Sequence, residues 1–178
     1  MEEQPVLTLR STIKPSLKKN QIIRGSLLGG LGVIIWLYGA LFLSLNTLAA
    51  WGWLILILGG LFIAWGLVPY RKLMRLENRP HKIILTDLDE LYFLSQNITL
   101  FKVELKNVEE MAYLDDNERY GIGLWIKNPM KNIQTLHPSL QLEEYLKDTR
   151  KRYLCDLFFP YFSKPSYQEL EDFYKTAD

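Results

Sequence analysis

Residues 25–70 read GSLLGGLGVIIWLYGALFLSLNTLAAWGWLILILGGLFIAWGLVPY, a run of 46 residues without a charged side chain. A bilayer core of roughly 30 Å is crossed by about 20 helical residues, so the run predicts two transmembrane helices. We place them at residues 25–45 and 48–70, with a tight turn at Asn46 and Thr47, the most polar pair in the run. The alternative, a hairpin buried inside a soluble protein, fits poorly with so long and uniformly apolar a run.

Basic residues flank the apolar run on both sides. Five Lys/Arg and two Glu precede it, five Lys/Arg and only Glu77 lie in residues 71–82, and the predicted turn has no charge. Basic residues are retained on the cytoplasmic side, so we expect a multi-pass protein of the cell membrane with both termini cytoplasmic. Contacts with lipid headgroups or a partner are expected from Lys18, Lys19, Arg24, Arg71, Lys72 and Arg75.

The glycines of the run form two series with a spacing of seven residues. The series mirror each other about a point between Leu45 and Asn46. Small residues let membrane helices approach closely, and a repeat of seven keeps one face towards a partner helix. We therefore expect the two series to face each other at matching depths, although membrane helices are rich in glycine in any case. The expected helix-packing residues are Gly25, Gly32, Gly39, Gly52, Gly59 and Gly66.

Residues 82–178 change to a pattern typical of strands. Tyr120, Ile122, Leu124 and Ile126 alternate with other residues, which predicts a half-buried strand. Gly121 and Gly123 in the same strand favour strong curvature. We expect a turn at residues 115–118 and one strongly bent antiparallel sheet built from residues 82–87, 90–94, 98–105, 108–114 and 119–128, with another strand at 155–162.

Two helices are expected in the same region. The first, at about residues 138–151, has an apolar stripe through Leu142, Tyr145 and Leu146, which we expect to pack on the strand at 119–128. Its end carries Arg150, Lys151 and Arg152, either as a solvated helix end or as a contact for headgroups or an acidic partner. A capping box of Ser166 and Glu169 predicts the start of the last helix. The domain is therefore of the α+β class.

This layout resembles small bacterial membrane proteins that have a two-helix hairpin followed by a pleckstrin-homology-like cytoplasmic domain. The resemblance rests on VLTLRST (6–12), the glycine-rich hairpin, ILTD (84–87), VELKNVEEMAYL (103–114) and IGLWIKNP (122–129). That family is largely uncharacterised, so the resemblance implies a fold and no activity. It divides the chain into a cytoplasmic segment (1–24), the hairpin (25–70), a basic linker (71–81) and the pleckstrin-homology-like domain (82–178).

No group of residues indicates catalysis, a cofactor or a metal site. His81 and His137 lie far apart, each beside a proline, and are interpreted as solvated loop histidines; a metal site needs several ligands. Cys155 is interpreted as a core thiol. Two acidic groups fall in predicted turns, where carboxylates are ordinarily solvated: Asp87, Asp89 and Glu90, and Asp115, Asp116 and Glu118.

Charge narrows the choice of function. Residues 83–178 carry a net charge of −6, which excludes nucleic acid as a favoured partner. The first hypothesis is a non-enzymatic membrane protein whose cytoplasmic domain binds a protein partner or assists a membrane complex. The alternative is a peripheral sensor of anionic lipid that uses the juxtamembrane basic residues. A third is an enzyme with an unrecognised site.

Overall fold

The computed structural model describes residues 4–116 and 119–177, which form two compact units. One unit is the helical hairpin Pro15–Arg75. The other combines the described parts of Met1–Lys14 and Leu76–Asp178 into a mixed domain of helices and antiparallel sheets. Residues 117 and 118 of the expected turn at 115–118 lie outside the described residues.

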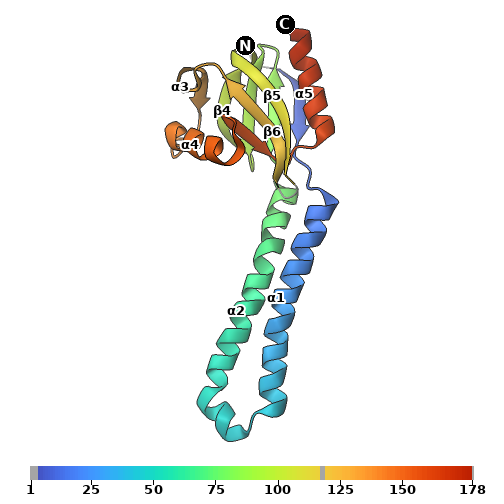
Figure 1. Ribbon diagram of the computed structural model, residues 1–178, viewed down its shortest axis with the longest axis vertical. Helices are drawn as coiled ribbons and strands as arrows, with labels where there is room; N and C mark the ends of the chain where they lie inside the picture. Colours follow the sequence, from blue (N-terminus) through green and yellow to red (C-terminus); the bar gives the residue numbers. More distant parts are fainter. Residues whose placement is uncertain (1–3, 117–118, 178) are drawn as a thin grey trace. The chain divides into compact units, whose positions relative to one another are not determined.

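The hairpin consists of two antiparallel helices, α1 (Pro15–Phe42) and α2 (Leu45–Asn78) (Figure 1). Both are long and apolar enough to cross a membrane. Large apolar side chains along them are exposed, including Leu27 at 66% and Trp65 at 69%, so they are not helices buried in the core of a soluble domain.

The turn of the hairpin was predicted at the wrong residues. Leu43 and Ser44 connect the helices, and Asn46 and Thr47 lie in the first turn of α2. The backbone N–H of Thr47 donates to the Ser44 hydroxyl group at 3.3 Å, so Ser44 caps the helix. Both helices also extend past the apolar run, and residues 15–24 and 71–78 are helical rather than separate segments.

A five-stranded antiparallel sheet has the order β1-β2-β3-β4-β7. The N-terminal strand β1 pairs with β2, so it belongs to the domain and not to a segment of its own, as we had expected for residues 1–24. The hairpin is thus inserted in the connection between two neighbouring strands. The strands are β1 (Pro5–Arg10), β2 (Lys82–Thr86), β3 (Glu90–Ser95), β4 (Ile98–Glu104) and β7 (Ile133–Thr135).

A second, three-stranded sheet contains β5 (Val108–Asp116), β6 (Arg119–Ile126) and β8 (Leu157–Pro160), in that order. The expectation of one continuous sheet was wrong. The 3₁₀ turn η1 (Leu105–Asn107) separates β4 from β5, because it redirects the chain and places the buried Leu105 in the core. One hydrophobic core joins the two sheets, with the rings of Phe93 and Phe159 stacked at 4.6 Å.

Three helices complete the domain: α3 (Pro129–Asn132), α4 (Leu142–Tyr153) and α5 (Lys164–Ala177). The last helix begins before the predicted capping box. The Ser163 hydroxyl group accepts the backbone N–H of Ser166 at 3.4 Å, so Ser163 is the cap. The hydroxyl groups of Tyr167 and Tyr174 donate to the carbonyl groups of Met111 and Val108, which ties α5 to β5.

The predicted burial of β6 is confirmed. Tyr120, Ile122, Leu124 and Ile126 are all at most 3% exposed, and Leu146 of α4 belongs to the same core. We expected α4 to pack on β6, but the rings of Tyr145 and Tyr153 lie against Phe101 of β4 at 4.8 Å and Phe158 of β8 at 3.9 Å. Gly121 has a steric role in addition to the strand curvature that we expected from it. A Cβ atom on it would clash with the carbonyl oxygen of Phe159 in β8, so the glycine permits the approach of the two strands.

The linker between β1 and α1 is held against the domain by Tyr120, and we call this set of contacts the clasp. The Tyr120 hydroxyl group donates to the carbonyl of Thr12 at 2.6 Å and accepts the backbone N–H of Lys14 at 2.6 Å. The backbone N–H of Thr12 donates to the carbonyl of Tyr161 at 2.8 Å. The Lys14 ammonium group lies 4.3 Å from the centre of the Tyr120 ring and 2.7 Å from Asp115.

Candidate functional site

The helices of the hairpin make their closest contact through two pairs of glycines. A Cβ atom on Gly25 would lie 2.5 Å from the carbonyl oxygen of Gly66, and one on Gly32 would lie 2.5 Å from that of Gly59. Neither position leaves room for a side chain. The hydrogen bond from the Trp36 indole N–H to the carbonyl of Leu56, at 3.2 Å, lies in the same region. We call these four glycines the seam.

The third pair of the mirror pattern is not brought together. A Cβ atom on Gly39 would meet Ile55 at 3.0 Å, whereas one on Gly52 would meet only Leu48 of its own helix, at 3.7 Å. Equal spacing along the sequence therefore does not produce equal contacts along the whole hairpin. The seam lies in the half that is nearer to the basic residues.

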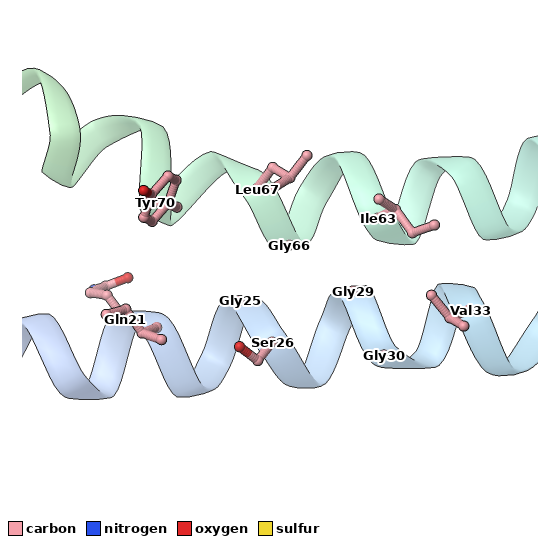
Figure 2. A pocket seen from close by; sticks show the side chains of 11 residues that line it. Gln21, Gly25, Ser26, Gly29, Gly30, Val33, Ile63, Gly66, Leu67 and Tyr70 are labelled. Atoms are coloured by element: carbon pink, nitrogen blue, oxygen red, sulfur yellow. The ribbon is translucent and has the colours of Figure 1, made fainter.

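A groove of about 530 Å³ opens between α1 and α2 beside the seam (Figure 2). Gln21 and Tyr70 lie at one end of it, with Ser26 nearby, and Val33 and Ile63 lie at the other end. Gly29 and Gly30 form part of its wall. A Cβ atom on either glycine would meet no atom within 4 Å, so the groove exists partly because these side chains are missing.

The basic residues that flank the apolar run lie on the helical extensions. Lys18, Lys19 and Arg24 belong to α1, and Arg71, Lys72 and Arg75 belong to α2. The unit 15–75 contains these six basic residues and no Asp or Glu, and the nearest carboxylate along the chain is Glu77. Exposed side chains of one sign, beside an apolar surface, suit anionic headgroups.

In the domain, a cleft of about 660 Å³ follows α4 and is lined by Glu144, Lys147, Asp148, Lys151 and other residues. The structure separates the members of the predicted basic cluster. The guanidinium group of Arg150 lies 2.6 Å from the buried Asp156, whose other oxygen accepts the backbone N–H of Ile126 at 2.9 Å. This ion pair fixes the loop after α4, while the Arg150 side chain itself remains 56% exposed and does not line the cleft.

Arg152 and Lys151 differ from Arg150 in their surroundings. Arg152 pairs with Asp148 one turn earlier, at 2.8 Å, and both side chains are more than half exposed. An exposed pair of this kind contributes little to stability. Lys147, Lys151 and Arg152 are therefore the basic side chains that the cleft presents to solvent.

Leu154 is an unusual residue at the end of α4. Its side chain is 80% exposed, and its backbone has φ of 59°, in the left-handed region that a branched apolar residue rarely adopts. The indole N–H of Trp125 donates to its carbonyl at 2.9 Å, and its own N–H donates to the carbonyl of Arg150 at 3.1 Å. The fold thus holds a large apolar side chain out into solvent. We call the cleft together with Leu154 the α4 surface.

His81 does not resemble the solvated loop residue that the sequence predicted, whereas His137 does lie in a loop, between β7 and α4. His81 is only 7% exposed and lies between Phe93 and Tyr161, with ring centres at 5.8 and 6.2 Å. Burial lowers the pKa of His81, and its Nδ1 atom has no hydrogen-bond partner. His137 is half-buried, and its Nδ1 lies 2.8 Å from the Ser139 hydroxyl group.

The other groups with chemical potential are also held in structural roles. Cys155 is buried, and burial raises the pKa of its thiol to about 12, which disfavours a reactive thiolate. Asp115 pairs with Lys14, and Glu90 pairs with Lys102 at 2.7 Å. Among residues 4–116 and 119–175, no three His, Cys, Asp or Glu side chains are grouped so that they could hold a metal ion.

Comparison of the chain with protein-family models, with curated proteins and with solved structures found no match. Sequence reasoning missed Tyr120 as the centre of the clasp, Asp156 as the partner of Arg150, and Leu154. Each of these roles depends on residues that are distant in sequence or on a backbone conformation.

Proposed function

We propose that this chain is a non-enzymatic membrane protein whose domain binds a protein partner on the α4 surface. The observation that carries the proposal is Leu154, an exposed leucine in a left-handed conformation. Such a conformation costs of order 1 kcal/mol and persists where the surrounding structure enforces it. We infer that it is retained for binding, because Leu154 is held out in solvent three residues after Lys151, which lines the cleft.

The chemistry of the α4 surface indicates the kind of partner. Lys151 lies one turn before Leu154, and Lys147 one turn before Lys151, so two basic side chains precede the apolar one on the same part of the helix. A partner segment with acidic side chains beside an apolar side chain would complement this arrangement. The rest of the domain is acidic, which limits where such a segment could bind.

The pleckstrin-homology-like fold is also part of the proposal. Two antiparallel sheets around one core, with a C-terminal helix against β5, support the comparison. The short strand β7 and the helix α4 are additional to these two sheets and their C-terminal helix. We also propose an orientation with the domain and both termini in the cytoplasm, which the six basic residues of the hairpin and its uncharged turn support.

Site-specific photocrosslinking in cells tests the partner. A photoreactive residue at Leu154 should give a discrete protein adduct, and Lys147→Glu with Lys151→Glu should abolish it. Leu88, an exposed leucine in the turn between β2 and β3, is the matched control and should give no such adduct. Identical adducts from positions 88 and 154 would reject the α4 surface as the site.

A second candidate, sensing of anionic lipid by the domain and its basic flanks, has one supporting observation. The hairpin carries six basic residues and no acidic one. Cosedimentation of the full chain cannot distinguish this role from anchoring. A change in the yield of the Leu154 adduct with the lipid composition would distinguish the two roles. Only a sensor alters its binding to the partner with the charge of the bilayer.

A further inference from the structure

We propose that the groove between α1 and α2 binds one acyl chain of an anionic phospholipid, whose headgroup lies beside Gln21, Tyr70 and the lysines of the first turns of α1. The proposal requires the hairpin to span a membrane and is independent of the α4 surface.

The walls of the groove indicate a ligand and not only helix packing. The seam glycines are explained by the contact between the helices, since a Cβ atom on them would strike the opposite backbone. Gly29 and Gly30 are different, because a Cβ atom on either would enter empty space. Glycine is about 1 kcal/mol worse than alanine in a helix, so two such glycines maintain a hollow that packing alone does not need.

The length of the groove matches one leaflet. It extends from Gln21 to Val33 along α1, which is about 18 Å at 1.5 Å per residue. Half of a hydrocarbon core of roughly 30 Å is about 15 Å. The volume of about 530 Å³ is in the range of small-molecule sites, whereas a helix of a second chain is about 10 Å wide and needs a broader surface.

Polarity along the groove orients the ligand. The apolar end, at Val33 and Ile63, is deep in the uncharged run, and the polar end, at Gln21 and Tyr70, is at its margin (Figure 2). Lys18 lies three residues before Gln21 and four before Ile22, and Lys19 lies three before Ile22, so each lysine shares a face of α1 with a residue that lines the groove. Positive charge at the interfacial end favours an anionic headgroup over a zwitterionic one.

Native mass spectrometry of the full chain, released from mild detergent after incubation with equal amounts of dioleoylphosphatidylglycerol and dioleoylphosphatidylcholine, tests the site. The unmodified chain should retain one lipid, with phosphatidylglycerol preferred about tenfold. Gly30→Leu should fill the groove and lose the lipid. Gly52→Leu, which adds the same side chain to a glycine outside the groove, should retain it.

Three further variants test whether a loss of lipid reflects misfolding, and whether charge sets the lipid preference. Ser26→Leu fills the groove from a different position and should lose the lipid with unchanged helical circular dichroism. Lys18→Gln with Lys19→Gln should abolish the preference for phosphatidylglycerol, whereas Lys72→Gln, on a different face of its helix from Tyr70, should not. Equal lipid retention by Gly30→Leu and Gly52→Leu would overturn the proposal. So would a lipid-free dimer that Gly30→Leu dissociates, because a second copy would then occupy the groove.

Discussion

At the scale of single residues, Tyr120 shows how one side chain serves both the core and the connection to the hairpin. Its ring is fully buried, and its hydroxyl group binds backbone groups of Thr12 and Lys14. Burial raises the pKa of this phenol, so it stays protonated and can donate to the Thr12 carbonyl.

Gly121→Ala should destabilise the domain by about 1–3 kcal/mol or more, because its Cβ atom would strike the backbone of β8 and not a movable side chain. Gly123→Ala is the matched control. Its Cβ atom would meet the end of the Leu114 side chain at 2.9 Å, which can shift, so we expect a smaller loss. Thermal unfolding of both variants in detergent measures the difference, and equal midpoints would contradict the steric argument.

Acidification should weaken the domain through His81. Its pKa in the folded state is lowered from 6.5 by burial, so the unfolded chain binds more protons, and stability falls as the pH drops below about 6.5. His81→Phe keeps an apolar ring between Phe93 and Tyr161 and should remove this part of the pH dependence. The measurement is the unfolding midpoint at pH 7.5 and 5.5, with His137→Gln as the control that should retain the dependence.

At the scale of elements, the hairpin is organised by its glycines over only part of its length. In a membrane no hydrophobic force draws helices together, so close packing must supply the stabilisation. The seam supplies it near the basic ends, where Gly25, Gly32, Gly59 and Gly66 are all buried. The turn end contains Gly52, where an added Cβ atom would meet no atom of α1 within 4 Å.

Gly32→Leu should therefore separate the helices, and Gly52→Leu should leave them in place. Disulfide crosslinking between cysteines at positions 39 and 55, whose Cβ atoms would lie 4.0 Å apart, in a chain with Cys155 replaced by alanine, reports the separation. The crosslink should become inefficient with Gly32→Leu and persist with Gly52→Leu. If both variants crosslink equally well, the seam does not hold the hairpin together.

At the scale of the whole molecule, the domain is discontinuous in sequence, because the hairpin interrupts it between β1 and β2. Leu9 of β1 is buried in the core at 4% exposure, and the strand covers the edge of β2. Residues 82–178 alone would therefore lack part of the core and expose a sheet edge, which invites aggregation.

A soluble chain in which a Gly/Ser linker of about ten residues replaces residues 15–75 should fold, and residues 82–178 alone should be markedly less stable. Leu9→Ala in the linked chain should cost about 2–5 kcal/mol, whereas Thr8→Ala, at an exposed position, should cost little. Urea denaturation provides the comparison. Equal stability with and without β1 would show that the strand is dispensable.

The local patterns of the chain determined the elements. The uncharged run is enough to predict two long helices, and alternation in residues 82–126 is enough to predict the strands, because each depends only on which face of an element is apolar. The seam at Gly32 and Gly59 also lies at positions that the sequence spacing suggested, since the hairpin turn is short and keeps the two helices in register.

Only the tertiary structure decided which distant parts of the chain contact each other. Nothing in PVLTLR marks it as a partner of a strand more than 70 residues later, because backbone pairing carries little sequence information. The burial of His81, which we expected in solvent, could not be predicted either. Its neighbours Phe93 and Tyr161 come from other parts of the chain. The groove, too, depends on how two helices diverge beside a contact, which glycine spacing by itself does not specify.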